Sequence, residues 1–231
     1  MAIYSYSKQK PSIAKKIVST LSIIFILAGV SLIITVVYPI ISFELYYSPK
    51  YQTVISPVVE TDSVPARIGQ ALGAPFADLT QARLWFPQAK PLKLMRNLNR
   101  YSLTIQRLKI DKAEVMLGGE DLSKSLIQFT GPIPGEIGNP VIFGHSTLLL
   151  FYNTKDYKAI FSKLPELNIG DLIGVEVDNV SFVFRVYKMY ITGPNDLSVL
   201  NQDTETRDLT LVTCVPPGTY FKRFIVKARL E

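Results

Sequence analysis

The feature that most constrains this chain is an uncharged run near its beginning, from Ile17 to Phe43, in which Ile, Leu, Val and Phe dominate. A helix needs about 20 apolar residues to cross the hydrocarbon core of a bilayer, so this run is long enough. The alternative is a cleaved signal peptide, whose apolar region usually has only about 7–15 residues before a small-residue cleavage site. We find no such site, and we predict an uncleaved transmembrane signal anchor over residues 17–43, with the lipid bilayer as its partner.

The charges around the anchor predict its orientation. Four lysines precede the run and Glu44 follows it, which favours a cytoplasmic N-terminal tail over residues 1–16. The protein is then a single-pass protein of the cell membrane, with everything after about residue 44 outside the cell. The remaining 21 basic and 19 acidic residues nearly cancel, so we expect no nucleic-acid partner, which would need a clustered basic face.

Residues 44–99 form a region rich in proline, where only a short helix around residues 78–85 is expected. One interpretation is a semi-rigid spacer that holds the following domain away from the bilayer. The other is that Leu84-Trp85-Phe86-Pro87 folds back and covers an apolar patch or the active site, because an exposed aromatic pair is unfavourable.

From residue 100 to 231 the pattern is mainly β, with about eight short runs of apolar residues at alternating or turn-bounded positions. Residues 172–177 and 181–191 are expected to form a hairpin across Asp178-Asn179, and residues 157–164 have helical spacing. Such a series of short strands indicates either a closed barrel or a sandwich. The expected strands cover residues 103–108, 113–117, 125–130, 140–143, 172–177, 181–191, 209–214 and 221–230.

The only cysteine, Cys214, ends an apolar strand, and Arg223 opens the next strand after a Pro-Pro-Gly turn. If the two strands pair, Cys214 and Arg223 flank the same end of the sheet. A thiolate is the reactive form of cysteine, and a neighbouring cation favours it. The only histidine, His145, also follows an apolar strand and could act as an acid. One cysteine and one histidine make a zinc site unexpected, and we expect no metal or cofactor.

Each of these three residues also has an ordinary structural interpretation. A lone cysteine is most often a small buried apolar residue, a histidine after glycine is often a turn residue, and Arg223 beside Lys222 could be a solvated strand end. Their joint placement is what favours a catalytic role.

These segments resemble the sortases, the membrane-anchored cysteine transpeptidases of bacterial cell surfaces. Residues Thr210–Cys214 are similar to the T-L-x-T-C motif, and Arg223 falls where the essential arginine lies. Residues Phe143–Ser146 resemble the segment that carries the histidine, and Phe161–Leu164 with Gly170-Asp171 resemble the stretch that follows it. The resemblance covers more than half of the chain.

The resemblance implies a closed sortase-type β-barrel and a two-step acyl transfer. Cys214 would cleave a C-terminal sorting motif of the Leu-Pro-x-Thr-Gly type on a secreted protein and form a thioester. His145 would protonate the leaving amine, and Arg223, with support from Thr213, would stabilise the tetrahedral intermediate. The acceptor would be an amine of a peptidoglycan precursor or a pilin-type lysine.

The subgroup and two rival functions stay open. Pro216 after Cys214 resembles the non-housekeeping sortases, yet the Asp-Pro-aromatic lid motif of many pilin-type members is missing, with Ala74-Pro75-Phe76 the nearest approach. One rival is an anchored thiol hydrolase in which water replaces the amine. The other is a catalytically idle β domain that binds a peptide or a glycan.

Overall fold

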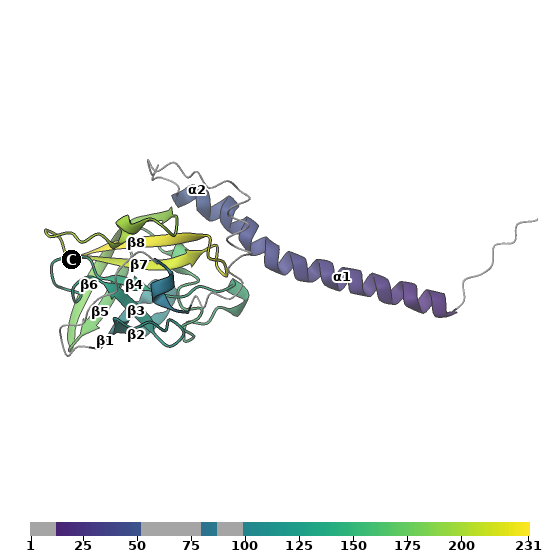
Figure 1. Ribbon diagram of the computed structural model, residues 1–231, viewed down its shortest axis with the longest axis horizontal. Helices are drawn as coiled ribbons and strands as arrows, with labels where there is room; N and C mark the ends of the chain where they lie inside the picture. Colours follow the sequence, from purple (N-terminus) through teal and green to yellow (C-terminus); the bar gives the residue numbers. More distant parts are fainter. Residues whose placement is uncertain (1–12, 52–79, 87–98) are drawn as a thin grey trace, which may run out of the picture.

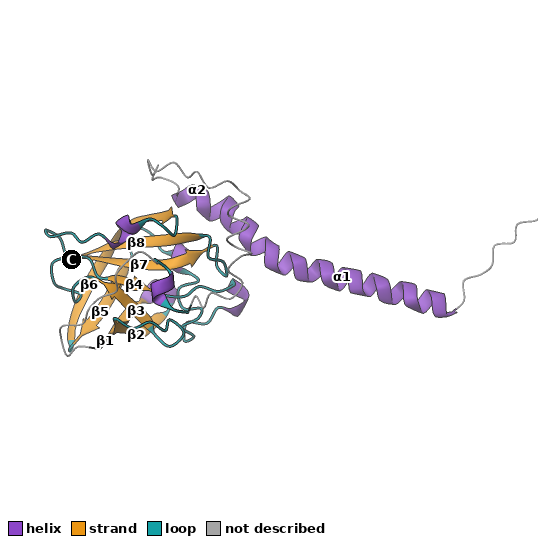
Figure 2. Cartoon of the chain, viewed as in Figure 1, coloured by secondary structure: helices purple, strands orange, loops and turns teal. Residues whose placement is uncertain are grey.

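A computed structural model describes residues 13–51, 80–86 and 99–231. Within them eight strands close into a barrel in the order β1-β2-β3-β4-β7-β8-β6-β5 (Figure 1). The mainly β barrel is confirmed, with only short helices around it (Figure 2). The strands are β1 (Arg100–Ile105), β2 (Ile110–Leu117), β3 (Leu126–Thr130), β4 (Val141–Phe143), β5 (Leu172–Val177), β6 (Val180–Thr192), β7 (Asp208–Val215) and β8 (Lys222–Leu230).

The hairpin between β5 and β6 forms where the sequence predicts it. Val177 pairs with Val180, and the two connecting residues, Asp178 and Asn179, have φ values of 48° and 65°. A two-residue hairpin turn of this kind requires left-handed residues, and Asp and Asn tolerate that conformation best after glycine. The helical spacing of residues 157–164, which predicts one or two turns, corresponds to a series of turns followed by the 3₁₀ helix η5 (Leu164–Glu166), whose Pro165 stands at the helix start.

Strand β7, which carries Cys214, lies between β4 and β8 in the barrel. It pairs in parallel with β4 and antiparallel with β8, and every one of its residues is buried. Its two faces contact two separate apolar clusters. Leu209, Leu211 and Val215 belong to the barrel interior, whereas Val212 and Cys214 belong to a second cluster on the outer side.

The second cluster is closed by a short segment from before the barrel. The 3₁₀ helix η2 (Ala82–Leu84) is followed by Trp85 and Phe86, which are fully buried against Phe143 of β4. The Trp85 and Phe143 rings are stacked at 5.4 Å. Burying an aromatic pair of this size stabilises the covered form by several kcal/mol, on the order of 2–3 per side chain.

The N-terminal helix α1 (Ile13–Ser42) projects away from the barrel and continues through η1 (Phe43–Tyr47) and α2 (Ser48–Tyr51) (Figure 1). Within the described residues one helix is long and apolar enough to cross a membrane, with a mean hydropathy of 2.7, and a signal sequence meets the same criterion. The helix therefore is a candidate membrane anchor.

The C-terminal end of this helical segment, up to Tyr51, packs on the barrel, although the sequence predicted that a spacer begins at residue 44. Phe43 and Tyr51 are buried in the main cluster, and the Tyr51 hydroxyl donates to the Pro165 carbonyl oxygen at 2.7 Å. Lys222 of β8 pairs with Glu44 at 3.3 Å. The segment up to residue 51 is thus docked on the barrel, while residues 52–79 and 87–98 of the expected spacer lie outside the described residues.

Candidate active site

Cys214 and Arg223 face each other across two adjacent strands. They are direct register partners of β7 and β8, and the Arg223 Nη1 donates to the Cys214 Sγ at 3.5 Å. The alternation of side chains along the strands places both on the outer face, in the second apolar cluster. The sequence-based expectation that the two residues flank one end of the sheet agrees with this geometry.

The guanidinium of Arg223 is buried, and its hydrogen bonds go to neutral groups. Nη1 donates to the Tyr220 carbonyl oxygen at 3.0 Å, and Nη2 donates to the Trp85 carbonyl oxygen at 3.3 Å. No described carboxylate pairs with Arg223, and its Nε has no hydrogen-bond partner among the described residues. Burying a cation without a counterion costs free energy. An unused N–H donor of Arg223 beside the thiol can therefore stabilise a negative charge that forms at this position.

His145 reaches the same place from β4. Phe143 pairs with Val212 in parallel register, and the Gly144 amide donates to the Val212 carbonyl oxygen at 3.1 Å. His145 therefore follows β4 by the same two residues that separate Cys214 from Val212, on backbones about 5 Å apart. Glycine is needed before the histidine, because a Cβ at Gly144 would collide with the Phe161 side chain.

Two hydroxyls tie the histidine segment to β7. The Ser146 hydroxyl donates to the Cys214 carbonyl oxygen at 2.7 Å, and the Thr213 hydroxyl donates to the Gly144 carbonyl oxygen at 2.8 Å. Thr213 lies on the opposite face of β7 from Cys214, so its side chain positions Gly144 rather than pointing at the thiol. In this structure the Thr213 hydroxyl is thus bonded to the histidine segment, and its expected support of an oxyanion stays a prediction.

Trp85 and Phe86 cover the three residues. The Trp85 ring lies 5.7 Å from the His145 ring, and the Arg223 guanidinium lies 5.4 Å from the Trp85 centroid and 6.0 Å from the Phe86 centroid. Cys214 is 1% exposed. Burial raises the pKa of the Cys214 thiol, and the charge of Arg223 offsets part of that effect. In this covered form the thiol is buried under Trp85, out of reach of a peptide, and its environment favours the neutral form.

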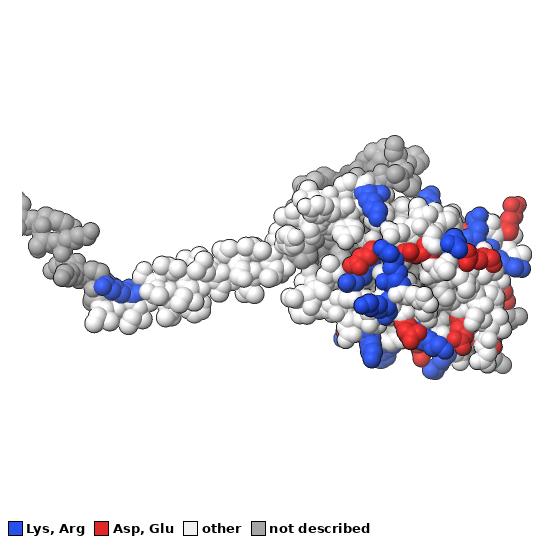
Figure 3. Space-filling model, turned by 180° about the vertical axis from the view of Figure 1, so that it is seen from behind, with Lys and Arg blue, Asp and Glu red and all other residues white. Residues whose placement is uncertain are grey.

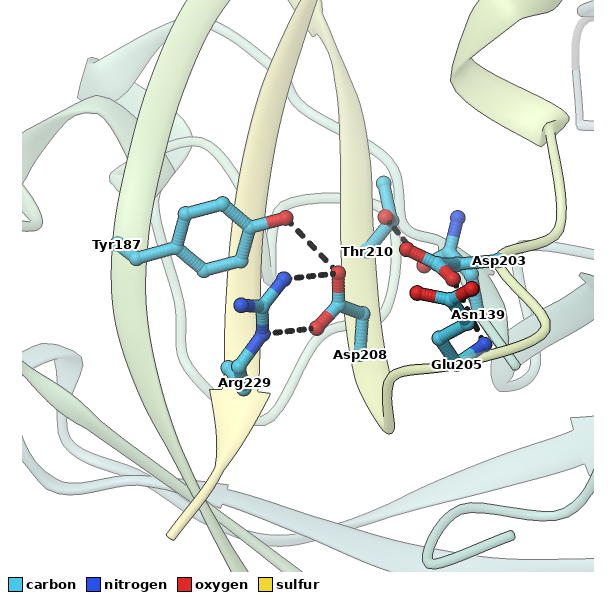
Figure 4. A network of polar contacts seen from close by, with 7 residues as sticks. All are labelled: Asn139, Tyr187, Asp203, Glu205, Asp208, Thr210 and Arg229. Carbon is cyan, nitrogen blue, oxygen red and sulfur yellow. Dashed lines mark hydrogen bonds and ion pairs between the residues drawn. The ribbon is translucent and has the colours of Figure 1, made fainter. Parts of the chain in front are cut away.

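A polar hollow in the described part of the molecule lies elsewhere. A polar cavity of about 440 Å³ is lined by residues at the start of β7 and the end of β8, among them Asp203, Asp208 and Arg229. Asp208, which lines this cavity, is six positions before Cys214 on β7, a distance of about 20 Å along a strand. Asp208 there accepts hydrogen bonds from Tyr187 and Arg229 (Figure 4). We place the candidate site at Cys214, where Trp85 fills the space, because a thiol, an imidazole and a guanidinium come together there, whereas the residues that line the cavity include neither Cys nor His.

The described residues contain no group of three or more His, Cys, Asp or Glu side chains that could hold a metal ion. The residues around Cys214 are apolar or hydroxyl-bearing apart from His145 and Arg223. The arrangement therefore offers a nucleophile, a titratable imidazole and a fixed cation, which are the parts needed for acyl transfer through a thioester.

Comparison with known proteins agrees with this site and fold. The family model of the sortase domain matches residues 103–231, more than half of the chain, so the protein belongs to the sortase family. No curated protein sequence matches the chain at a significant level.

Solved structures of several sortases are similar in fold. Sortase C1 from Streptococcus agalactiae, in complex with MTSET, has 19% identity and a TM-score of 0.52, covering 72% of this chain and 84% of that chain. A lid mutant of sortase A from Corynebacterium diphtheriae has 20% identity and a TM-score of 0.50, covering 83% and 91%. Sortase C-1 from Actinomyces oris has 16% identity and a TM-score of 0.50, covering 65% and 93%.

Two contributors to the site were not identified from sequence. Ser146 stands directly after His145, and the Tyr220 carbonyl oxygen holds Arg223, but neither role has a local pattern. The adjacency of Ser146 to the only histidine was the available hint. The position of Trp85 and Phe86 agrees with the alternative in which they cover the active site.

Proposed function

We propose that this sortase is a cysteine transpeptidase in which Cys214, His145 and Arg223 carry out the chemistry. The observation that supports this most is the register pair of Cys214 and Arg223, in which a buried guanidinium without a described carboxylate donates to the thiol sulfur. Its substrate would be a secreted protein with a C-terminal sorting motif of the Leu-Pro-x-Thr-Gly type. Its acceptor would be an amine of the cell envelope or of another protein subunit.

The first step forms a thioester. The Cys214 thiolate attacks the carbonyl carbon of the scissile peptide bond, and the tetrahedral intermediate carries a negative oxygen. Arg223 cannot lose its proton and stabilises this charge from its buried position. His145 donates a proton to the leaving nitrogen as the C–N bond breaks, so the departing fragment leaves as a neutral amine.

The second step transfers the acyl group. The incoming amine attacks the thioester carbonyl and gives up a proton to His145, and the C–S bond breaks to return the Cys214 thiolate. Arg223 stabilises the oxyanion a second time and then the thiolate. The bonds formed and broken leave every oxidation state unchanged, so neither step calls for a redox cofactor.

The covered form is proposed to be a resting state with a lid. One of the similar structures, that of C. diphtheriae sortase A, is of a lid mutant. In this chain Trp85 and Phe86 occupy the space above Cys214, and the Trp85 carbonyl accepts from Arg223 as a substrate carbonyl would. A peptide must displace this segment before the thiol can attack.

The apolar helix is proposed to anchor the enzyme in the cell membrane, with residues 1–16 in the cytoplasm and the barrel outside. Figure 3 supports this, because the helix surface is neutral apart from lysines at its N-terminal end. Treating intact cells and opened cells with a protease tests the orientation. Protection of the barrel in intact cells would contradict it.

The experiment that tests the function uses the full chain in lipid nanodiscs, a library of fluorogenic peptides of the Leu-Pro-x-Thr-Gly type and a small amine. We expect cleavage coupled to amine ligation, with an acyl-enzyme on Cys214 detected by intact mass. Cys214→Ala should form no acyl-enzyme, and His145→Ala should slow product formation by about 10²–10⁴-fold.

The same experiment separates the rival functions. Cleavage at a rate that does not change with the amine, with a hydrolysed product only, would indicate a thiol hydrolase. No acyl-enzyme with any peptide, including in a Trp85→Ala variant whose cover is reduced, would indicate a binding domain and overturn the proposal.

A further inference from the structure

Five large apolar side chains are exposed together at one end of the barrel, and we call them the apolar rim. Leu149, Leu150 and Phe151 form the 3₁₀ helix η4 (Leu149–Phe151), and Tyr220 and Phe221 end the turn between β7 and β8. They are between 44% and 77% exposed. Scattered apolar residues are ordinary on a protein surface, but a group of this size marks a contact with a partner.

The two segments of the apolar rim are neighbours in space. A Cβ placed on Gly218 of the β7–β8 turn would lie 2.9 Å from Leu148, which directly precedes η4. The rim also adjoins the helix that leaves the barrel, because Leu149 and Pro217 share a small hollow with Phe43 and Tyr47. The ion pair between Lys222 and Glu44 fixes the same junction. Figure 1 shows this end of β7 and β8 directed toward α1.

The length of the helix sets the height of this junction above a membrane. The uncharged run begins at Ile17, and about 20 residues, or about 30 Å of helix, cross the hydrocarbon core. The span then ends near Val37, about 10 Å of helix before the buried Phe43. The polar interface on each side of a bilayer is about 5–8 Å thick. The helix therefore brings the rim to the level of the lipid headgroups.

The amino-acid composition of the apolar rim is suited to the membrane interface. No residue of 146–154 or 209–221 is charged, so both rim segments are free of charged side chains. The opposite end of β7 and β8 instead carries Asp203, Glu205 and Asp208 around its cavity. Aromatic and aliphatic side chains without charge prefer the membrane interface, whereas carboxylates avoid it.

We infer that the apolar rim rests on the outer surface of the bilayer beside the anchor helix, so that the end of the barrel bearing Cys214 faces the lipid. This inference depends on the proposed anchoring by α1, and its occupant is the lipid interface rather than a protein. Cys214, at the same end of β7, then lies near the level of the lipid headgroups. A peptide held at the level of the lipid headgroups then reaches Cys214 without moving away from the membrane into bulk water.

The test measures depth by site-directed spin labelling of the full chain in nanodiscs. In a Cys214→Ser background, single cysteines are introduced by Leu150→Cys and Tyr220→Cys in the rim, Val180→Cys at the far end of β6, and Val30→Cys in α1. All four positions are about half exposed or more, so labels should not disturb the fold. Circular dichroism checks each variant. Collision rates with oxygen and with a water-soluble nickel chelate report lipid and water exposure.

We expect the rim labels to collide with the nickel chelate at least about threefold less often than the label at residue 180, since an interfacial group sits several ångströms below the water. The label at residue 30 should be the least accessible. Equal accessibility at residues 150 and 180, with residue 30 in lipid, would overturn the inference and leave the anchoring intact. An aqueous label at residue 30 would overturn the anchoring. Protection of residue 150 only after addition of a sorting peptide with an apolar tail would show a peptide site and also overturn the inference.

Discussion

Strand β8 carries two arginines that occupy equivalent positions and have opposite surroundings. Arg223 pairs in register with Cys214, and Arg229 pairs in register with Asp208, on the same face of the same two strands. Each guanidinium lies over an aromatic ring, Trp85 for Arg223 and Tyr187 for Arg229. The two ends of the β7–β8 pair therefore place their arginines in nearly the same way, and the two sites differ in the groups that contact each guanidinium.

The partners determine what each cation can do. Asp208 neutralises Arg229 through two hydrogen bonds, at 2.8 and 3.2 Å, and that pairing raises the pKa of Arg229. Arg223 is 3% exposed and donates instead to the Cys214 sulfur and to three carbonyl oxygens, those of Tyr220, Lys222 and Trp85. A cation already paired with a carboxylate stabilises structure, whereas a buried cation without one attracts negative charge formed during a reaction.

The largest difference between the two ends should appear in catalysis. Arg223→Lys keeps the charge but loses the planar fork, and we expect acyl-enzyme formation to fall by about 10²–10³-fold, as when one oxyanion donor is removed. Arg229→Lys, the matched control, should change the rate less than threefold. Single-turnover mass spectrometry on the full chain measures both. Similar rates for the two variants would remove the distinction between the ends.

Uncovering Cys214 should make the thiol more acidic and more reactive. Burial is the first cause of its raised pKa, so Trp85→Ala admits water and lowers that pKa while Arg223 stays in place. We expect thiol alkylation below pH 8 to accelerate about 10–100-fold and its pH midpoint to move downward. Trp85→Phe, which keeps an aromatic cover, is the control. An unchanged midpoint in Trp85→Ala would contradict the role of the cover.

Stability should respond in the opposite order to catalysis. Arg229→Met leaves the nearly buried Asp208 carboxylate without its cation, and we expect the free energy of unfolding to fall by about 2–3 kcal/mol. Arg223→Met removes a cation that has no described carboxylate, and a loss of about 1 kcal/mol or less is expected. Urea unfolding of both variants provides the comparison. A larger loss for Arg223→Met would indicate that its carbonyl contacts outweigh its desolvation.

The smallest effect concerns Tyr187 in alkaline solution. Burial, followed by the hydrogen bond to Asp208, raises the pKa of Tyr187 to about 12 from 10.0. Its stabilising contribution is therefore complete below pH 10 and is lost as the pH rises from 10 to 12. Because the ring is about one-third exposed, we expect only about 1 kcal/mol.

Tyr187→Phe should flatten that part of the curve of unfolding free energy against pH. Tyr46→Phe, at an exposed tyrosine outside the barrel, is the control and should leave the slope near that of the parent chain. A parent curve without any decline between pH 10 and 12 would contradict the assignment.

Sequence periodicity predicted the parts of the structure that depend on neighbouring residues. The β5–β6 hairpin follows from Asp178-Asn179 between two alternating runs, and the proximity of Cys214 and Arg223 follows from a tight turn between two strands. Contacts between distant segments had no such local pattern. The parallel pairing of β4 with β7, which brings His145 to the site, joins segments about 70 residues apart.

The course of the chain before the barrel was the least predictable part. The frequent prolines of residues 44–99 indicated a spacer, yet Phe43 and Tyr51 dock on the barrel, while Trp85 lies over the thiol as in the alternative interpretation of its segment. The docking of Phe43 and Tyr51 depends on apolar surfaces that only the folded barrel creates, so no local sequence pattern specifies it.

The closure of the barrel limits how a peptide can be recognised. β1 pairs with both β2 and β5, which completes the ring, so the eight described strands present no open sheet edge. We therefore expect an extended peptide to be held mainly by side chains and loops rather than as an additional strand, the mode in which backbone hydrogen bonds supply affinity with little regard to sequence. Closure of the barrel thus favours recognition of a substrate by the side chains of its particular amino acids.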